Sequence, residues 1–257
     1  MSSLRHQLAD SLLLGKRNLL RFRRSPEMVI GFLVQPVMFI LLFVYVLGGA
    51  IETPGFDYVD FLMPGIIVQT IAFGGFVTAI ALAEDMRKGL IDRFRSLPIA
   101  RSAVLAGRTL ADVVTNAASL AVMLIVGLLV GFSFDANIVE IVGGLLLLLL
   151  LGYAFSWIFA LLGLSSSTPE AAQQVGFIII FPLTFASSAF VPVDSMPSWL
   201  QAFAEINPFT VLVDAMRALW IGTPAGNSIW GAVAWCVGLI VVFAPIATWR
   251  YRQAVSD

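Results

Sequence analysis

Residues 61–102 read FLMPGIIVQTIAFGGFVTAIALAEDMRKGLIDRFRSLPIARS. The first 23 of these residues carry no charge, whereas the stretch from Glu84 to Ser102 holds five of the 15 basic residues of the chain. About 20 apolar helical residues cross the hydrocarbon core of a membrane. The stretch therefore predicts a membrane-spanning helix that is followed by a short basic segment at the membrane surface.

The same apolar pattern recurs along the 257 residues, of which 59% are hydrophobic and 12% are charged. The mean hydropathy of +0.94 is too high for a soluble domain of this size. Strands of a barrel would be about half as long and would alternate in polarity. We therefore predict an all-α integral membrane protein, one domain over 1–257, with six transmembrane helices in the uncharged runs 28–50, 61–83, 113–134, 141–164, 171–193 and 229–249.

Basic residues are segregated along the chain and predict its orientation. They gather before the first run, in 84–108 and in the last residues, and Arg217 alone falls elsewhere. The loops at 51–60 and 135–140 contain acidic residues but no Lys or Arg. Because cytoplasmic loops are enriched in Lys and Arg, we expect both termini and 84–108 to lie in the cytoplasm.

The segment 1–26 precedes the first run and has an amphipathic pattern. One narrow arc of a helical wheel holds Leu4, Leu8, Leu12, Leu19 and Phe22, and the basic residues lie outside that arc. This pattern predicts an N-terminal interfacial helix that rests on membrane lipid, and the alternative is an ordinary charged flank without a specific role. A cleaved signal peptide is disfavoured, because the apolar run is too long.

Residues 194–223 contain start and stop signals for two short amphipathic helices. Ser195 with Pro197 predicts the first helix start, Asn207 with Pro208 the second, and Gly222 the stop. The two helices, of about nine and fourteen residues, are too short to span a membrane. We predict an outer re-entrant helix pair, with an ion pair between Asp214 and Arg217 three residues apart.

Catalytic and metal-binding patterns are absent from the sequence. The only histidine, His6, has no partner ligands, and Cys236 has no neighbouring histidine. The dipeptide at 15–16, Gly-Lys, lacks the upstream glycine of a phosphate-binding loop. We therefore expect no enzyme activity, metal site or cofactor in this chain alone.

Uncharged polar residues and prolines interrupt the apolar runs. The prolines bend helices and free backbone carbonyls. Each polar side chain has a packing explanation that is as good as a role in substrate contact. Our candidates for a substrate path are Gln35, Gln69 and Asn116, together with the bent first, second and fifth helices.

The basic stretch 84–102 contains a short amphipathic helix. Gly89 and Pro98 bound it, and the apolar side chains at positions 90, 91, 94 and 97 share one face. An isolated helix of about eight residues is only marginally stable. Docking of its apolar face into a groove of a partner protein would explain why this segment forms a helix. The alternative is a basic loop that rests on anionic lipid.

Taken together, these features resemble the permease subunits of type-2 ATP-binding cassette (ABC) exporters, in particular the daunorubicin-resistance-like drug-efflux branch. The resemblance covers nearly the whole chain. It is most specific in FPLTFASSAFVPVDSMPSWLQAFAEINPFTVLVDAMRAL at 181–219, and next in RKGLIDRFRSLPIARS at 87–102.

The resemblance implies that the short helix is a cytoplasmic coupling helix seated in a separate ATPase subunit, which binds ATP and Mg. Its ATPase-binding residues are Gly89, Leu90, Ile91, Asp92, Arg93, Phe94, Arg95, Leu97 and Pro98. A second copy or a paralogous permease completes the exporter in a bacterial plasma membrane, and no nucleic-acid partner is expected. The cargo would be a hydrophobic or amphiphilic drug, antibiotic or lipid-like molecule. Polysaccharide or glycolipid export and an ATP-independent secondary transporter are the alternatives.

Overall fold

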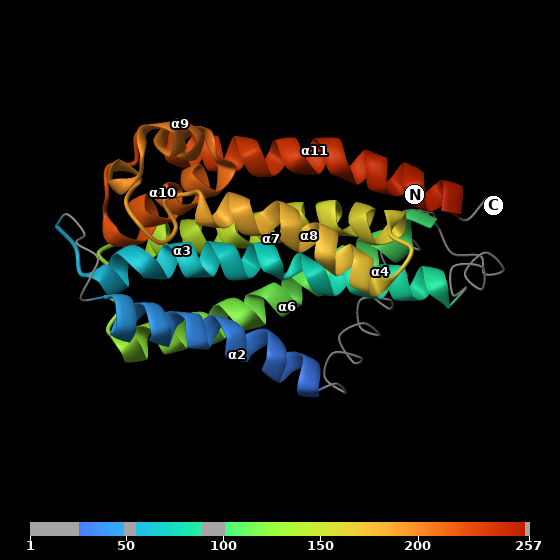
Figure 1. Ribbon diagram of the computed structural model, residues 1–257, viewed down its shortest axis with the longest axis horizontal. Coiled ribbons are helices and arrows are strands. Elements are labelled where there is room, and N and C mark those ends of the chain that lie inside the picture. Colours follow the sequence, from blue (N-terminus) through green and yellow to red (C-terminus); the bar gives the residue numbers. More distant parts are fainter. Residues whose placement is uncertain (1–25, 49–54, 89–100, 255–257) are drawn as a thin grey trace.

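The computed structural model describes residues 26–48, 55–88 and 101–254, in which helices form one elongated bundle (Figure 1). The interfacial helix expected in 1–25 and the coupling helix expected between Gly89 and Pro98 lie outside the described residues. The helices are α2 (Pro26–Leu42), η1 (Phe43–Leu47), α3 (Tyr58–Phe73), α4 (Gly75–Arg87), α6 (Arg101–Val130), α7 (Ile138–Ser165), α8 (Pro169–Phe185), η2 (Val193–Ser195), α9 (Ser198–Ile206), α10 (Pro208–Ile221) and α11 (Ser228–Ala254).

Four helical stretches in the described parts are long and apolar enough to cross a membrane: Tyr58–Arg87, Ala111–Val130, Ile138–Ser165 and Ser228–Gln253. Each coincides with a predicted span. The other two predicted spans correspond to α2 with η1, and to α8, which has 17 residues and ends at Phe185 rather than near 193. The all-α class is therefore confirmed for the described residues, and the count of six spans stays a prediction.

The α9–α10 end of the bundle follows the predicted turn signals closely. Helix α9 has nine residues and α10 has fourteen, as the sequence predicts. Asn207 accepts a bond from the Phe209 amide, and Gly222 ends α10 with a left-handed φ of 69°. The predicted cap at Ser195 is wrong, because Pro197 occupies the N-cap of α9 and the Ser195 hydroxyl donates to the Pro192 carbonyl instead.

Helices α3 and α4 run end to end through the middle of the bundle (Figure 1). Gly74 joins them with helical φ and ψ, so that Tyr58–Arg87 is one continuous span. Residues 62–72 of this span are buried throughout, and α3 packs against α2, α6, α7 and α10. The α3–α4 span is therefore central to the bundle, whereas α11 packs on α7 and α10.

Seven of the hydroxyl groups in the described helices form hydrogen bonds within their own helix. Each donates to the carbonyl four residues earlier, which satisfies a polar group that has no water to bind. The side chains concerned are Thr70, Thr115, Ser119, Ser156, Ser166, Thr184 and Thr248. Their presence in apolar helices therefore needs no ligand to explain it.

Glycines allow the α3–α4 span to approach its neighbours closely. A Cβ atom on Gly65 would overlap the backbone of Ala189, and one on Gly163 would overlap the backbone of Ala79. Backbone atoms in a packed interface cannot move aside as a flexible side chain can. Small residues of this kind are typical where membrane helices pack against one another.

We predict that Gly65→Ala destabilises the protein, because its new methyl group meets the Ala189 carbonyl. Overpacking of this kind costs about 1–3 kcal/mol. The matched control is Gly238→Ala in α11, where a Cβ atom would meet nothing within 4 Å. The control should change the melting temperature little or raise it, since alanine favours helices by about 0.5–1 kcal/mol over glycine. Equal melting temperatures for both variants in detergent would contradict this packing.

Candidate functional site

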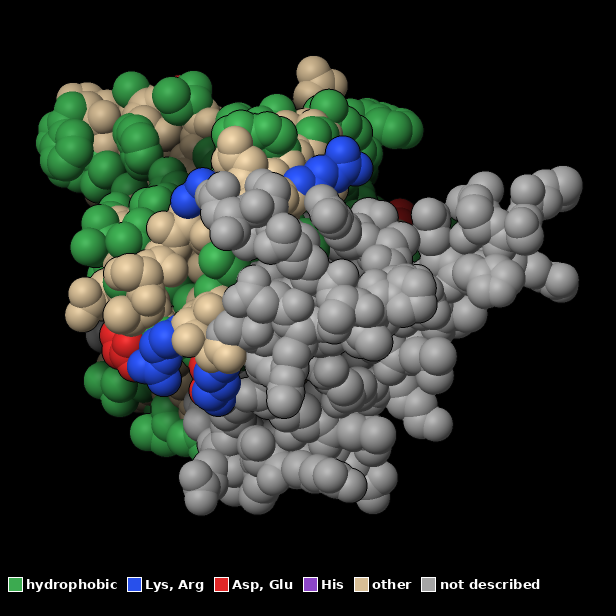
Figure 2. Space-filling view, turned by 90° about the vertical axis from the view of Figure 1, so that its right-hand side faces the viewer, with side chains coloured by type: hydrophobic (Ala, Val, Ile, Leu, Met, Phe, Trp, Pro, Cys, Tyr) green, Lys and Arg blue, Asp and Glu red, His purple; other side chains and the backbone are tan. Residues whose placement is uncertain are grey.

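Basic side chains gather at one end of the bundle, opposite the α9–α10 end, and we call it the basic end. Helix α4 finishes there with Arg87 and Lys88, and α11 finishes there with Arg250 and Arg252. Figure 2 looks onto this end and shows Lys and Arg side chains beside the residues drawn in grey. Basic residues that are clustered in the sequence are therefore also clustered at one end of the bundle.

The two helices that border the segment 89–100, α4 and α6, are joined by a buried polar cluster at the first turn of α4. Arg108 of α6 donates through Nη2 to the carbonyl of Val77 in α4, at 2.8 Å. Thr78 of α4 donates a short hydrogen bond to Asp112 of α6. Arg108 also lies 3.8 Å from Asp112, measured from Nε to Oδ1, as expected for residues one helical turn apart.

This cluster, formed by Val77, Thr78, Arg108 and Asp112, ties α4 to α6. Asp112 is 8% exposed and Thr78 is fully buried, so water does not compete for these bonds. Arg108 and Asp112 are four residues apart, a spacing at which opposite charges pair on one face of a helix, but the sequence has no sign of the threonine or of the carbonyl on the other helix. The nine residues expected to bind an ATPase lie between these two helices, outside the described residues.

The three candidates for a substrate path lie on three different helices. Gln35 is exposed on α2, and Gln69 is 9% exposed on α3. Asn116 of α6 is 3% exposed and packs against Gly74 and Gly152, where a Cβ atom would overlap its amide. A packing role therefore explains Asn116, and the assignment of all three residues to a path stays a prediction.

A row of phenylalanine rings runs along α8 and across to α2, and we call it the phenylalanine row. Adjacent ring centroids are 4.3–5.8 Å apart. The three rings on α8 remain 37–44% exposed, so that the row presents ring surface outside the packed core. Its members, in order, are Phe39, Phe43, Phe190, Phe185, Phe181 and Phe177.

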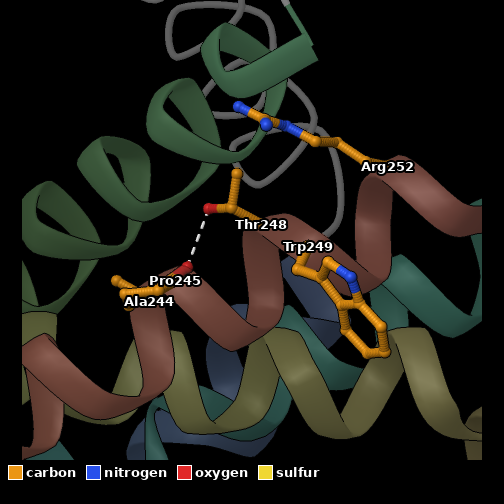
Figure 3. A pocket seen from close by; sticks show the side chains of 5 residues that line it. All are labelled: Ala244, Pro245, Thr248, Trp249 and Arg252. Carbon is orange, nitrogen blue, oxygen red and sulfur yellow. Dashed lines mark hydrogen bonds between the residues drawn. The ribbon is translucent and has the colours of Figure 1, made fainter.

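A shallow cavity of about 420 Å³ lies along α11 near the basic end, as Figure 3 shows. Its described lining is Ala244, Pro245, Thr248, Trp249 and Arg252, and Thr248 donates to the Ala244 carbonyl at 2.7 Å. In Figure 3 the Trp249 ring and the Arg252 guanidinium extend to different sides of the helix. An indole beside an arginine is typical of a membrane–water interface.

A second cavity, of about 720 Å³, opens at the α9–α10 end and is acidic. Asp57, Asp60 and Asp135 line it. Asp60 already accepts bonds from the amide and hydroxyl of Ser133, at 2.8 and 3.2 Å. Among the described residues, no group of three or more His, Cys, Asp or Glu side chains is placed to hold a metal ion.

Arg217 of α10 forms the densest polar cluster at the α9–α10 end, although only 4% of its surface is exposed. Its guanidinium donates to the Phe61 carbonyl at 3.0 and 2.9 Å, and to the Ser188 carbonyl at 2.7 Å. It also bonds Asp214 at 3.2 Å, which confirms the predicted ion pair. The carbon of the guanidinium lies 3.5 Å from the centre of the Phe61 ring. The carbonyl partners were missed, because a backbone acceptor leaves no trace in the sequence.

Asn207 connects α8 to the helix pair in the same region. Its amide nitrogen donates to the carbonyls of Leu183 and Ala186, at 2.7 and 2.8 Å, where α8 ends one turn after Pro182. Its oxygen caps α10 at the same time. In the most specific stretch of the sequence, 181–219, side chains of the second half therefore satisfy backbone groups of the first half.

Comparison with known proteins identifies relatives of this chain. The model of the ABC-2 type transporter family matches residues 11–220. The daunorubicin resistance ABC transporter permease protein DrrB1 of Streptomyces coeruleorubidus is 36% identical over 237 residues, which cover 92% of this chain and 84% of that protein.

Two further relatives are more distant. The probable doxorubicin resistance ABC transporter permease protein DrrC of Mycobacterium tuberculosis is 28% identical over 96% of this chain and 90% of its own length. The putative transport permease ycf38 of Cyanophora paradoxa is 28% identical over 83% of this chain and 74% of its own length. With a family match over most of its length, this chain belongs to the ABC-2 type transporter family, as a relative of drug-resistance permeases.

Proposed function

We propose that this chain is the transmembrane permease subunit of an ATP-driven exporter, and that a separate ATPase subunit drives it through the segment 84–102. The observation that carries the proposal is the buried cluster that joins the first turn of α4 to α6. Arg108 and Asp112 bind Val77 and Thr78 across the two helices that enter and leave this segment. A force on the segment would therefore move α4 and α6 together rather than bend one of them.

The partner subunit would bind ATP and Mg, and this chain would need no cofactor of its own. Its sequence offers no phosphate-binding loop, which supports hydrolysis on a separate subunit. The complete exporter would contain two permeases, either two copies of this chain or this chain and a paralogue, with two ATPase subunits. Cargo would pass where the two permeases meet.

A hydrophobic or amphiphilic cargo fits the surface of the described helices. The exposed rings of Phe177, Phe181 and Phe185 offer flat apolar contacts along α8. Aromatic pairs of this kind add about 0.5–1.5 kcal/mol each beyond their buried area. The names of two relatives refer to daunorubicin and doxorubicin resistance, which supports a drug-like cargo. Gln35, Gln69 and Asn116 stay our candidates for polar contacts on the path.

The charge pattern supports a bacterial plasma membrane protein with its basic end and both termini in the cytoplasm. In that orientation the α9–α10 pair lies at the outer surface and re-enters the outer leaflet. Trp199 on α9 is 72% exposed, as suits a side chain at a membrane interface. The cavity beside Trp249 and Arg252 would then lie at the cytoplasmic interface.

We predict that Phe94→Ala weakens association with the ATPase while the permease still inserts into the membrane. Phe94 is the largest apolar side chain of the expected coupling helix, and truncation of a buried aromatic anchor costs about 2–4 kcal/mol of binding. The measurement is co-purification of the ATPase subunit with tagged permease, at low and high salt.

The control for this experiment is Arg95→Ala, on the opposite face of the same helix. A rim charge should matter less and in a salt-dependent way. If the segment only rests on lipid, the order reverses and the ATPase does not respond to Phe94→Ala. Normal co-purification of an ATPase with Phe94→Ala would refute the anchor, and co-purification of no ATPase with the wild type would refute the proposed function.

We also predict the orientation of the bundle from labelling of single cysteines in intact cells, after Cys236→Ala has removed the natural thiol. Asp57, just before α3, is exposed, and Arg250 on α11 is also exposed. An impermeant thiol reagent should label Asp57→Cys and should not label Arg250→Cys until the cells are opened. The reverse result would contradict a cytoplasmic basic end.

A further inference from the structure

The α9–α10 pair packs against the α3–α4 span, and one side chain adds hydrogen bonds between them. Arg217 lies on α10, and the Phe61 carbonyl, to which it donates two bonds, lies in the first turn of α3. Pro64 stands three residues after Phe61, inside the helix. Because proline has no amide hydrogen, the carbonyl four residues before it, at Asp60, lacks its helical donor, and Arg217 binds the next carbonyl in this turn.

The same guanidinium also holds the turn that follows α8. It donates to the Ser188 carbonyl at 2.7 Å, and the Ser188 hydroxyl donates to Asp214 at 2.8 Å. Asp214 in turn accepts from Arg217, so that these three residues form a closed ring of bonds. Three separate parts of the chain therefore meet at one arginine, whose planar fork of donors suits several acceptors at once.

We propose that Arg217 is a positioning residue that fixes the α9–α10 pair to the α3–α4 span, so that the pair follows this span when its basic end is displaced. Because α3 and α4 form one span from Tyr58 to Arg87, with Gly74 in helical φ and ψ at their junction, movement at Arg87 is transmitted along this span toward Phe61. The hydrogen bonds of Arg217 then transmit this movement to α10. The attachment itself is a property of the fold, and its use in transport rests on the proposed function.

The attachment is tested with Arg217→Met in purified, detergent-solubilised protein that lacks Cys236. A cysteine at Ala215, which is fully buried on α10, reports opening of the helix pair. A cysteine at Ala160, which is fully buried on α7 in a second core cluster, reports opening elsewhere. We expect labelling at 215 to accelerate by at least about tenfold, the factor that corresponds to about 1.4 kcal/mol, and labelling at 160 to stay unchanged.

The outcomes separate attachment from general stability. Equal acceleration at both positions would make Arg217 a general stability residue and would overturn the proposal, as would unchanged labelling at 215. Arg250→Met is the matched control, because the same change is made at an exposed arginine. Arg217→Lys keeps the positive charge but lacks the forked guanidinium, so we expect faster labelling at 215 than in the wild type. Labelling as slow as in the wild type would overturn the role of the guanidinium fork.

The coupled movement is tested with spin labels in the complex of the permease with its co-purified ATPase. One pair joins Asp57, before α3, to Ile206 on α9. A second pair joins Arg87, at the end of α4, to Arg250 on α11, and ATP should change this second distance because α11 packs on α7 and α10. In the wild type we expect a narrow distribution of the distance between the labels at 57 and 206, and ATP should not change it. In Arg217→Met we expect this distribution to be broad. A 57–206 distance that changes with ATP in the wild type would overturn the proposal while export stands. If ATP changes neither distance, the proposed function fails, and the width of the 57–206 distance in Arg217→Met still decides the attachment.

Discussion

The fold depends on how backbone carbonyls are satisfied where helices end or bend within the packed bundle. A buried carbonyl without a partner costs several kcal/mol. At the α9–α10 end, Arg217 supplies donors to Phe61 and Ser188, and Asn207 supplies donors to Leu183 and Ala186. These two side chains allow α8 to stop short and a short helix pair to return toward the core.

A buried arginine would be costly if it were alone. Here Asp214 and several carbonyls surround it, and its face lies against the Phe61 ring. Charged residues within membrane proteins that are paired in this way usually serve a function. Arg108 and Asp112 play a similar part between the first turn of α4 and α6, so that buried ionic groups hold the α3–α4 span at two places. The close contact of Gly65 with Ala189 lies between these two places.

The sequence predicted those features that local chemistry controls. Uncharged runs gave the positions of the long helices, and Asn207, Pro208 and Gly222 gave both bounds of α10, because capping depends on residues beside the helix end. It missed the early end of α8 at Phe185, since the bonds that cap it come from Asn207, more than twenty residues away. The candidate path was harder still. A buried amide such as Asn116 has the same sequence signal whether it packs against glycines or contacts a cargo.

The central claim is that ATP, and not an ion gradient, drives export through this chain. The most direct measurement is uptake of daunorubicin, as a probe cargo, by inside-out membrane vesicles that contain the permease with its co-purified ATPase. The account predicts uptake that requires ATP, stops when the ATPase is inhibited with vanadate and persists when the proton gradient is collapsed. Uptake that a proton gradient supports without ATP would contradict it, and would make this chain a secondary transporter.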